Sequence, residues 1–185
     1  HRVDRRQRQM CIRDRYRPNQ DAVEFFARQV LPHIRSQAPN ASLAVVGAYQ
    51  DAHRASLGEG TGVQLLGFVD SLQDTLEAAS IVVAPLREGL GTRLKILEAL
   101  SFGKPVVATH IGAYGIDLGP EEGLFREDDP KRMADLCLAL MHDPARRLQL
   151  GERGKRRVYE TYGPEALIAR MRLILDRAVR AKGNL

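Results

Sequence analysis

The chain has 185 residues, of which 44% are hydrophobic and 28% are charged, and its formal net charge is +5. This length suits one domain with its own core, and the composition is typical of a globular protein. No apolar run approaches the ~18 residues that a membrane span needs, so the sequence excludes a transmembrane protein.

The basic charge is concentrated at the N-terminus. Residues 1–17 contain seven arginines and two aspartates, whereas the other 168 residues contain 21 basic and 21 acidic side chains. Because the body is neutral, we expect no nucleic-acid partner. Residues 1–15 lack periodicity, and residues 10–15 resemble the translation of a common sequencing adapter, MCIRDR. We interpret residues 1–15 as a disordered or artefactual leader and residues 16–185 as the domain. The alternative is a natural basic arm that binds RNA or lipid head groups.

The two cysteines, Cys11 and Cys137, provide neither a disulfide framework nor a metal-ligand spacing. No apolar core follows the basic N-terminus, as it would in a secretory signal. These features favour a cytoplasmic protein. Cys137 falls on an apolar helical face, and we expect it to be a small core residue.

Helical and strand patterns alternate along residues 16–185, which is typical of an α/β domain with a mostly parallel sheet between two layers of helices. Apolar residues recur at helical spacing from about Asp21, and Pro32 is expected to kink the end of this first helix. Short apolar runs predict strands at 42–46, 63–66, 81–84, 106–109 and 123–126. Further helices are expected at about 52–57, 72–79, 93–102, 130–142, 144–162 and 165–180.

Two side chains are expected to cap helices. Ser71 stands before the third predicted helix, and Thr92 stands before the fourth. In the fourth helix the spacing of Leu94, Leu97 and Phe102 predicts the apolar face.

The segment between the third and fourth predicted strands carries the strongest candidate site. Gly89 and Gly91 lie just before a helix, where free backbone N–H groups and the positive end of the helix dipole attract anions. Arg93 and Lys95 add positive charge at the position where it opposes that dipole, which hints at function. The carboxylate of Glu98, one turn further, is suited to accept hydrogen bonds from a ribose diol. The alternative is that these charged residues form a solvated helix face.

The contiguous segment GLGTRLKILEALSFGKPVVAT resembles the donor site of family 4 glycosyltransferases, which have the two-lobed GT-B architecture. In that family the loop amides bind the diphosphate of a nucleotide-sugar, and the glutamate at the position of Glu98 binds the ribose. The resemblance implies a Rossmann-like fold, the C-terminal half of GT-B. It also implies that this lobe belongs to a retaining glycosyltransferase of the hexosyltransferase type, with a UDP- or GDP-sugar as donor.

The resemblance assigns the site residue by residue. Arg93 and Lys95 are the candidate catalytic residues, because a departing diphosphate needs positive charge. The candidate donor-binding residues are Gly47, Phe68, Val69, Glu88, Gly89, Leu90, Gly91, Thr92, Leu94 and Glu98. For Gly47 and Phe68 the alternatives are an ordinary turn and an ordinary core residue. His110 follows the fourth strand and either contacts the sugar or phosphate or is incidental.

The sequence departs from the family at one position. Much of the family has two glutamates eight positions apart, of which the first contacts the transferred sugar. Counting back eight positions from Glu98 gives Leu90, which has no polar group, and Glu88 is two residues out of register. The sugar contact is therefore left open.

The resemblance also implies the partners. We expect a nucleotide-sugar as donor substrate, no cofactor and no metal, since GT-B enzymes use helix dipoles and basic side chains. The N-terminal GT-B lobe, which recognises the acceptor, is the other expected partner, and a membrane surface is expected only through the full-length enzyme. In complete relatives a strand precedes the first helix. We expect that strand to be missing or overwritten here, which would expose a sheet edge.

Two rival functions remain. A nucleotide-sugar epimerase shares the GT-B architecture, and a degenerate lobe would keep the fold as a non-catalytic interaction domain. A nicotinamide-binding module is excluded, because the first strand is not followed by G-x-G-x-x-G with an acidic residue about 20 positions on.

Overall fold

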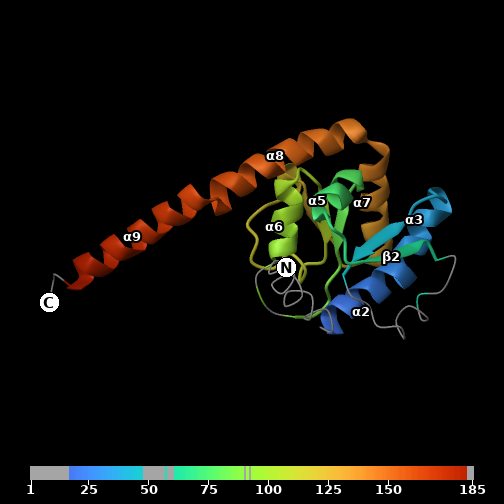
Figure 1. The fold of residues 1–185 in the computed structure, drawn as a ribbon, viewed down its shortest axis with the longest axis horizontal. Helices are drawn as coiled ribbons and strands as arrows, with labels where there is room; N and C mark the ends of the chain where they lie inside the picture. Colours follow the sequence, from blue (N-terminus) through green and yellow to red (C-terminus); the bar gives the residue numbers. More distant parts are fainter. Residues whose placement is uncertain (1–16, 48–56, 58–60, 90, 92, 183–185) are drawn as a thin grey trace.

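The computed structural model describes residues 17–47, 57, 61–89, 91 and 93–182 (Figure 1). Parallel strands and helices alternate along this part of the chain, as the sequence predicts. The elements are α2 (Arg17–Phe25), the π-helical turn η2 (Phe26–Val30), α3 (Leu31–Gln37), β1 (Leu43–Val46), β2 (Val63–Gly67), α5 (Leu72–Ala78), β3 (Val82–Ala84), α6 (Leu94–Ser101), β4 (Val106–Ala108), the 3₁₀ turn η3 (Pro120–Glu122), β5 (Leu124–Arg126), α7 (Pro130–His142), α8 (Pro144–Tyr162) and α9 (Pro164–Lys182). The helix predicted at 52–57 lies outside the described residues except for Leu57.

Strand β4 shows how the layers form, because its side chains alternate between two cores. Val107 packs into a cluster formed mainly by the η2, α3 and α7 side of the molecule. Val106 and Ala108 pack into a second cluster with α6 and the end of α8. All three residues are fully buried. Helices therefore cover both faces of the sheet, and the predicted three-layer α/β fold is confirmed.

The parallel strands form two hydrogen-bonded groups, β1–β2 and β3–β4–β5. In doubly wound sheets of order 3-2-1-4-5-6 the first strand lies between the second and the fourth. If β1 to β5 occupy positions two to six of that order, the position between β1 and β3 belongs to a strand that precedes α2. That part of the chain lies outside the described residues. In that order the unpaired edges of β1 and β3 border this middle position of the sheet.

The first helix differs from the prediction at its start and in its middle. It begins at Arg17 rather than near Asp21, and its centre is a π-helical turn in which the amide of Leu31 donates to the carbonyl of Phe26. Pro32 lacks an N–H group, so the usual bond to the carbonyl four residues earlier cannot form there.

Helix α6 also departs from the prediction. It begins at Leu94, with Arg93 as an N-cap that makes no side-chain capping bond, and Thr92 lies outside the described residues. Its buried residues are Ile96, Ala99 and Leu100. Leu97 packs against the same core cluster, whereas Leu94 is 66% exposed and Phe102 is 39% exposed. The predicted apolar face was therefore right at Leu97 and wrong at Leu94 and Phe102.

Other local predictions are confirmed. The Ser71 hydroxyl accepts from the amide of Asp74 at 3.1 Å and caps α5. Cys137 is fully buried in α7, and burial raises the pKa of its thiol to about 12. Gly103 follows α6 with a φ of +70°, a conformation that suits glycine at a helix end.

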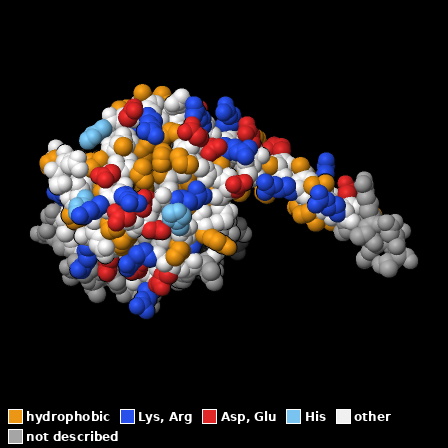
Figure 2. Space-filling model, turned by 180° about the vertical axis from the view of Figure 1, so that it is seen from behind, with side chains coloured by type: hydrophobic (Ala, Val, Ile, Leu, Met, Phe, Trp, Pro, Cys, Tyr) orange, Lys and Arg blue, Asp and Glu red, His pale blue; other side chains and the backbone are white. Residues whose placement is uncertain are grey.

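Helix α9 projects away from the body of the domain (Figures 1 and 2). Met171, Leu173, Ile174 and Leu175 are all more than half exposed, as expected for a surface that another part of the protein would cover. None of the described helices combines the length and the apolar character that crossing a bilayer requires.

Helix α8 packs very closely against the carboxyl-terminal end of α6 and against η3. A Cβ atom on Gly151 would lie 2.1 Å from the carbonyl oxygen of Gly103, and one on Gly154 would lie 2.5 Å from that of Glu122. Both obstacles are backbone atoms, which cannot rotate away as a side chain can. Glycine at these two positions therefore sets the distance between α8 and the rest of the domain.

We predict that Gly151→Ala destabilises the protein by about 1–3 kcal/mol, because the new methyl group overpacks a backbone contact. The same change in an open helix would stabilise it by about 1 kcal/mol, so the sign is diagnostic. Urea unfolding measures the difference. Leu148→Ala, at a residue on α8 that is 69% exposed, is the control and should change stability by less than about 0.5 kcal/mol. An unchanged or raised unfolding midpoint for Gly151→Ala would contradict the packing argument.

Candidate functional site

The candidate site lies at the carboxyl edge of the strands, where parallel α/β sheets bind ligands. Two glycines with positive φ end the first two strands, Gly47 at +124° and Gly67 at +69°. The amide of Gly47 donates to the carbonyl of Gly67 at 2.7 Å, so these strand ends lie side by side. Phe68 follows at 62% exposure, and its ring is therefore available to a ligand rather than buried in the core.

The loop after β3 is fixed to helix α2 by Arg87. Its guanidinium donates through two nitrogens to the carboxylate of Asp21, with an Nε–Oδ2 distance of 2.9 Å, and lies 5.0 Å from the ring centroid of Phe25. The hydrogen bond to Asp21 raises the pKa of Arg87, so the guanidinium remains charged. The first residues of the glycine loop are thereby held against the first helix.

The same loop is joined to the loop after β4 by Arg93. Its Nη2 donates to the carbonyl of Gly89 at 2.7 Å and to that of Ile111 at 3.2 Å. Because one nitrogen contacts both carbonyls, the two loops lie next to each other. The Nε atom of Arg93 is buried and has no hydrogen-bond partner among the described residues.

A second link between these loops runs through Thr109, which is almost fully buried. Its hydroxyl donates to the carbonyl of Leu86 and accepts from the amide of Gly112 at 2.9 Å. A Cβ atom on Gly112 would lie 2.2 Å from the carbonyl oxygen of Ala84. Glycine is thus needed at this position for the loops to approach each other.

The start of α6 is open to solvent above these loops. Leu94, Lys95 and Glu98 are exposed, and neither charged side chain has a partner among the described residues. Gly89 and Gly91 have φ values of +106° and +115°, which turn the backbone sharply ahead of the helix. Free amides of the first turn, the helix dipole and the Lys95 ammonium group together suit an anion such as a diphosphate.

The structure therefore brings together most of the residues predicted for the site. Glu88, Gly89, Gly91, Arg93, Leu94, Lys95 and Glu98 lie in one loop and the first turns of one helix. Gly47, Phe68 and Val69 follow β1 and β2, which form a separate hydrogen-bonded pair of strands. Leu90 and Thr92 lie outside the described residues. Arg93 makes its contacts with backbone carbonyls, which gives it a positioning role in the loop.

Sequence reasoning gave no role to the pair formed by His110 and Asp128. The carboxylate of Asp128 accepts from the amide of His110 and lies 2.9 Å from its Nδ1. His110 also borders a hollow of about 470 Å³ that Tyr114 and Arg126 help to line. No short motif links two residues 18 positions apart, so only the fold could reveal this pair.

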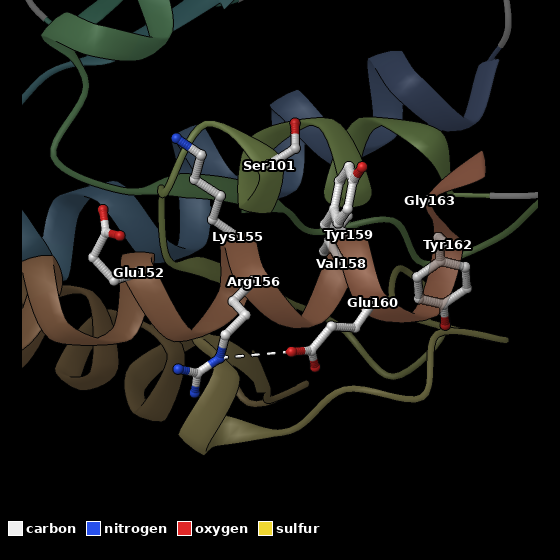
Figure 3. A pocket seen from close by; sticks show the side chains of 9 residues that line it. All are labelled: Ser101, Glu152, Lys155, Arg156, Val158, Tyr159, Glu160, Tyr162 and Gly163. Atoms are coloured by element: carbon white, nitrogen blue, oxygen red, sulfur yellow. Dashed lines mark ion pairs between the residues drawn. The ribbon is translucent and has the colours of Figure 1, made fainter. Parts of the chain in front are cut away.

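A second hollow, of about 530 Å³, lies along α8 and reaches Gly163, just before α9 (Figure 3). Arg156 pairs with Glu160 at 3.9 Å on one side of it. Tyr159 lines it as well, and a hydrogen bond to Glu165 raises the pKa of Tyr159. Ser101, which ends α6, is also part of the lining, so this hollow lies at the opposite end of α6 from the glycine loop. It contains none of the predicted site residues.

Fold and site define the class of protein: a doubly wound α/β domain with a glycine loop before a helix at the carboxyl edge of its sheet. Residues 8–143 match the family described as "Glycosyl transferases group 1". The chain belongs to this family.

Curated relatives agree with that assignment. The chain is 30% identical over 162 residues to a GDP-mannose-dependent monoacylated alpha-(1-6)-phosphatidylinositol monomannoside mannosyltransferase of Corynebacterium glutamicum, covering 80% of the chain and 42% of the relative. It is 34% identical over 116 residues to the lipopolysaccharide core biosynthesis mannosyltransferase LpsB of Rhizobium meliloti, covering 60% and 32%. The chain thus spans less than half the length of these relatives.

Solved structures show the same fold. A mutant of TarM from S. aureus, crystallised with fondaparinux, alpha-GlcNAc-glycerol and UDP, superposes with a TM-score of 0.68 at 23% identity, over 80% of this chain and 31% of that one. Sucrose-phosphate synthase from Thermosynechococcus elongatus superposes with a TM-score of 0.64 at 25% identity, over 83% and 43%. These neighbours are GT-B glycosyltransferases, which supports the GT-B assignment of this lobe.

We predict that Arg93→Ala lowers the thermal midpoint, because the loops after β3 and β4 lose a link of two hydrogen bonds, about 1–2 kcal/mol. Lys95→Ala should leave the midpoint unchanged or slightly raised, since an exposed cation at a helix start opposes the dipole. Thermal unfolding of the two variants side by side measures this contrast. Equal midpoints for both variants would contradict the positioning role of Arg93.

Proposed function

We propose that this chain is the nucleotide-sugar-binding lobe of a retaining glycosyltransferase that transfers a hexose from a nucleoside diphosphate sugar. The observation that carries the proposal is the glycine loop before α6, with Lys95 and Glu98 on the exposed face of the first turns and without a partner among the residues that the structure describes. The loop amides and Lys95 would bind the diphosphate, and the carboxylate of Glu98 would accept hydrogen bonds from the ribose hydroxyls.

The chemistry of the lobe follows from these positions. Breaking the bond between the sugar and the diphosphate develops negative charge on the leaving group. The first-turn amides and the helix dipole would stabilise that charge without moving, because α6 is packed in place before the donor arrives, and the Lys95 ammonium group would add positive charge. Arg93 would contribute by holding Gly89 and Ile111 together, so that the amides converge on one point.

The relatives support a nucleotide-linked donor. One mannosyltransferase is named as GDP-mannose-dependent, and one TarM structure contains UDP. The nucleoside of the donor is therefore expected to be uridine or guanosine, and adenosine is the third candidate. The cytoplasmic location expected from the sequence stays a proposal.

We predict that one of UDP, GDP and ADP binds, measured by calorimetry and by thermal shift. At about 100 times its dissociation constant that ligand should stabilise the protein by ~2.7 kcal/mol. Glu98→Gln removes the carboxylate charge at constant size and should weaken binding by about 10-fold or more, because hydrogen bonds to charged groups are strong.

Glu152→Gln is the matched control, because Glu152 lies on α8 beside the other end of α6. It should bind like the wild type. If a folded wild-type protein binds none of the three diphosphates, the degenerate interaction lobe becomes the better hypothesis.

A further prediction concerns turnover and metals. We expect these 185 residues to bind donor without transferring the sugar to an acceptor, because acceptor recognition in this architecture belongs to the other lobe. Donor binding should be the same with EDTA and with Mg²⁺. Transfer of a radiolabelled sugar to an acceptor would refute the prediction of no turnover. Donor binding only in the presence of metal would refute the prediction of metal independence.

A further inference from the structure

We infer that His110, positioned by Asp128, forms part of the subsite for the hexose of the donor, with its Nε2 atom accepting a hydrogen bond from a sugar hydroxyl. This inference rests on the proposed function, because it adds a sugar contact beside the diphosphate site.

The first step is proximity. His110 directly precedes Ile111, whose carbonyl accepts from the same Arg93 nitrogen that contacts the carbonyl of Gly89. Thr109, on its other side, is hydrogen-bonded to Leu86 in the loop after β3. His110 is therefore flanked by two residues that are tied to the loop of the proposed diphosphate site. Its side chain is 65% exposed, so it is available to a ligand at that edge.

The second step is orientation. Asp128 holds His110 at two points, with one carboxylate oxygen on the backbone amide and the other on Nδ1, both at 2.9 Å. A carboxylate can only accept, so Nδ1 carries the hydrogen. In the neutral ring Nε2 is then an acceptor. The opposite end of the ring, where Nε2 lies, is thereby fixed in direction and in tautomer.

The third step is the chemistry of the neighbouring hollow. Its volume of about 470 Å³ is in the range of small-ligand sites. Arg126 lines it, but its guanidinium donates to the carbonyls of Leu118 and Ile116 at 2.7 and 2.6 Å and so shapes the rim. The groups left for a ligand are His110, Tyr114 and Asp117, which are exposed. Neutral and acidic acceptors of this kind suit sugar hydroxyls, whereas a phosphate would need donors.

The test compares each diphosphate with its sugar conjugate: UDP with UDP-glucose and UDP-N-acetylglucosamine, and GDP with GDP-mannose. Calorimetry at pH 8 gives the ratio of the two dissociation constants for the wild type and for His110→Ala. We expect the variant to bind the bare diphosphate normally and the sugar conjugate ~3- to 10-fold more weakly, the effect of one hydrogen bond. His142→Ala, at the exposed end of α7, is the control and should change neither.

Three further variants distinguish a positioned sugar contact from a purely structural role. His110→Gln places its amide near the Nε2 position and should retain part of the extra affinity for the sugar conjugate over the bare diphosphate. His110→Asn places its amide near Nδ1 and should lose that extra affinity. Asp128→Asn should lower the extra affinity for the sugar conjugate and leave binding of the bare diphosphate unchanged. It should also alter the ring nitrogen chemical shifts of His110.

The outcomes distinguish the two proposals. If no diphosphate and no conjugate binds to the wild type, the proposed function fails. If both bind and the ratio is the same in the wild type and in His110→Ala, the diphosphate site stands and the role of His110 is overturned. An equal loss of both ligands in every His110 variant would also overturn it, because that loss would indicate damage to the loop.

Discussion

The candidate site depends on the close contact between the loops after β3 and β4. Short parallel strands end at one edge, but their loops would diverge without a link. Arg93 supplies that link on the surface side by contacting the carbonyls of Gly89 and Ile111, and Thr109 supplies it underneath. Gly112 lets the backbones approach to a distance that no side chain would allow. The charge of Arg93 thus acts on the protein itself, whereas the exposed Lys95 has no partner within the described part of the chain.

The rest of the domain holds the other end of α6 in place. Gly151 and Gly154 bring α8 into backbone contact with the turn after α6 and with η3. The buried face of α6, with Ile96, Ala99 and Leu100, packs onto the sheet. Helix α6 is therefore fixed along one side and at its far end, while its first turns remain open. A helix dipole aimed from a fixed support suits the stabilisation of a departing phosphate.

Much of this arrangement was predictable from the sequence, because strand, turn and cap signals are local. The strand positions, the cap at Ser71, the burial of Cys137 and the glycine loop before α6 followed from spacing alone. The apolar face of α6 was predicted only in part, since Leu94 and Phe102 are apolar and yet exposed. The pairing of His110 with Asp128 depends on which loops the fold brings together, which no local pattern shows. The π-helical turn lies directly before Pro32, whose missing N–H group predicts an irregular helix but does not specify its form.

The most direct test of the account is an NMR titration of the ¹⁵N-labelled chain with the diphosphate that binds. The account predicts that the largest amide shifts fall on Gly89, Gly91 and the first turn of α6, with smaller shifts at Ile111. Shifts gathered instead around the hollow along α8, at Lys155 and Tyr159, would show that the ligand binds elsewhere. That result would contradict the central claim.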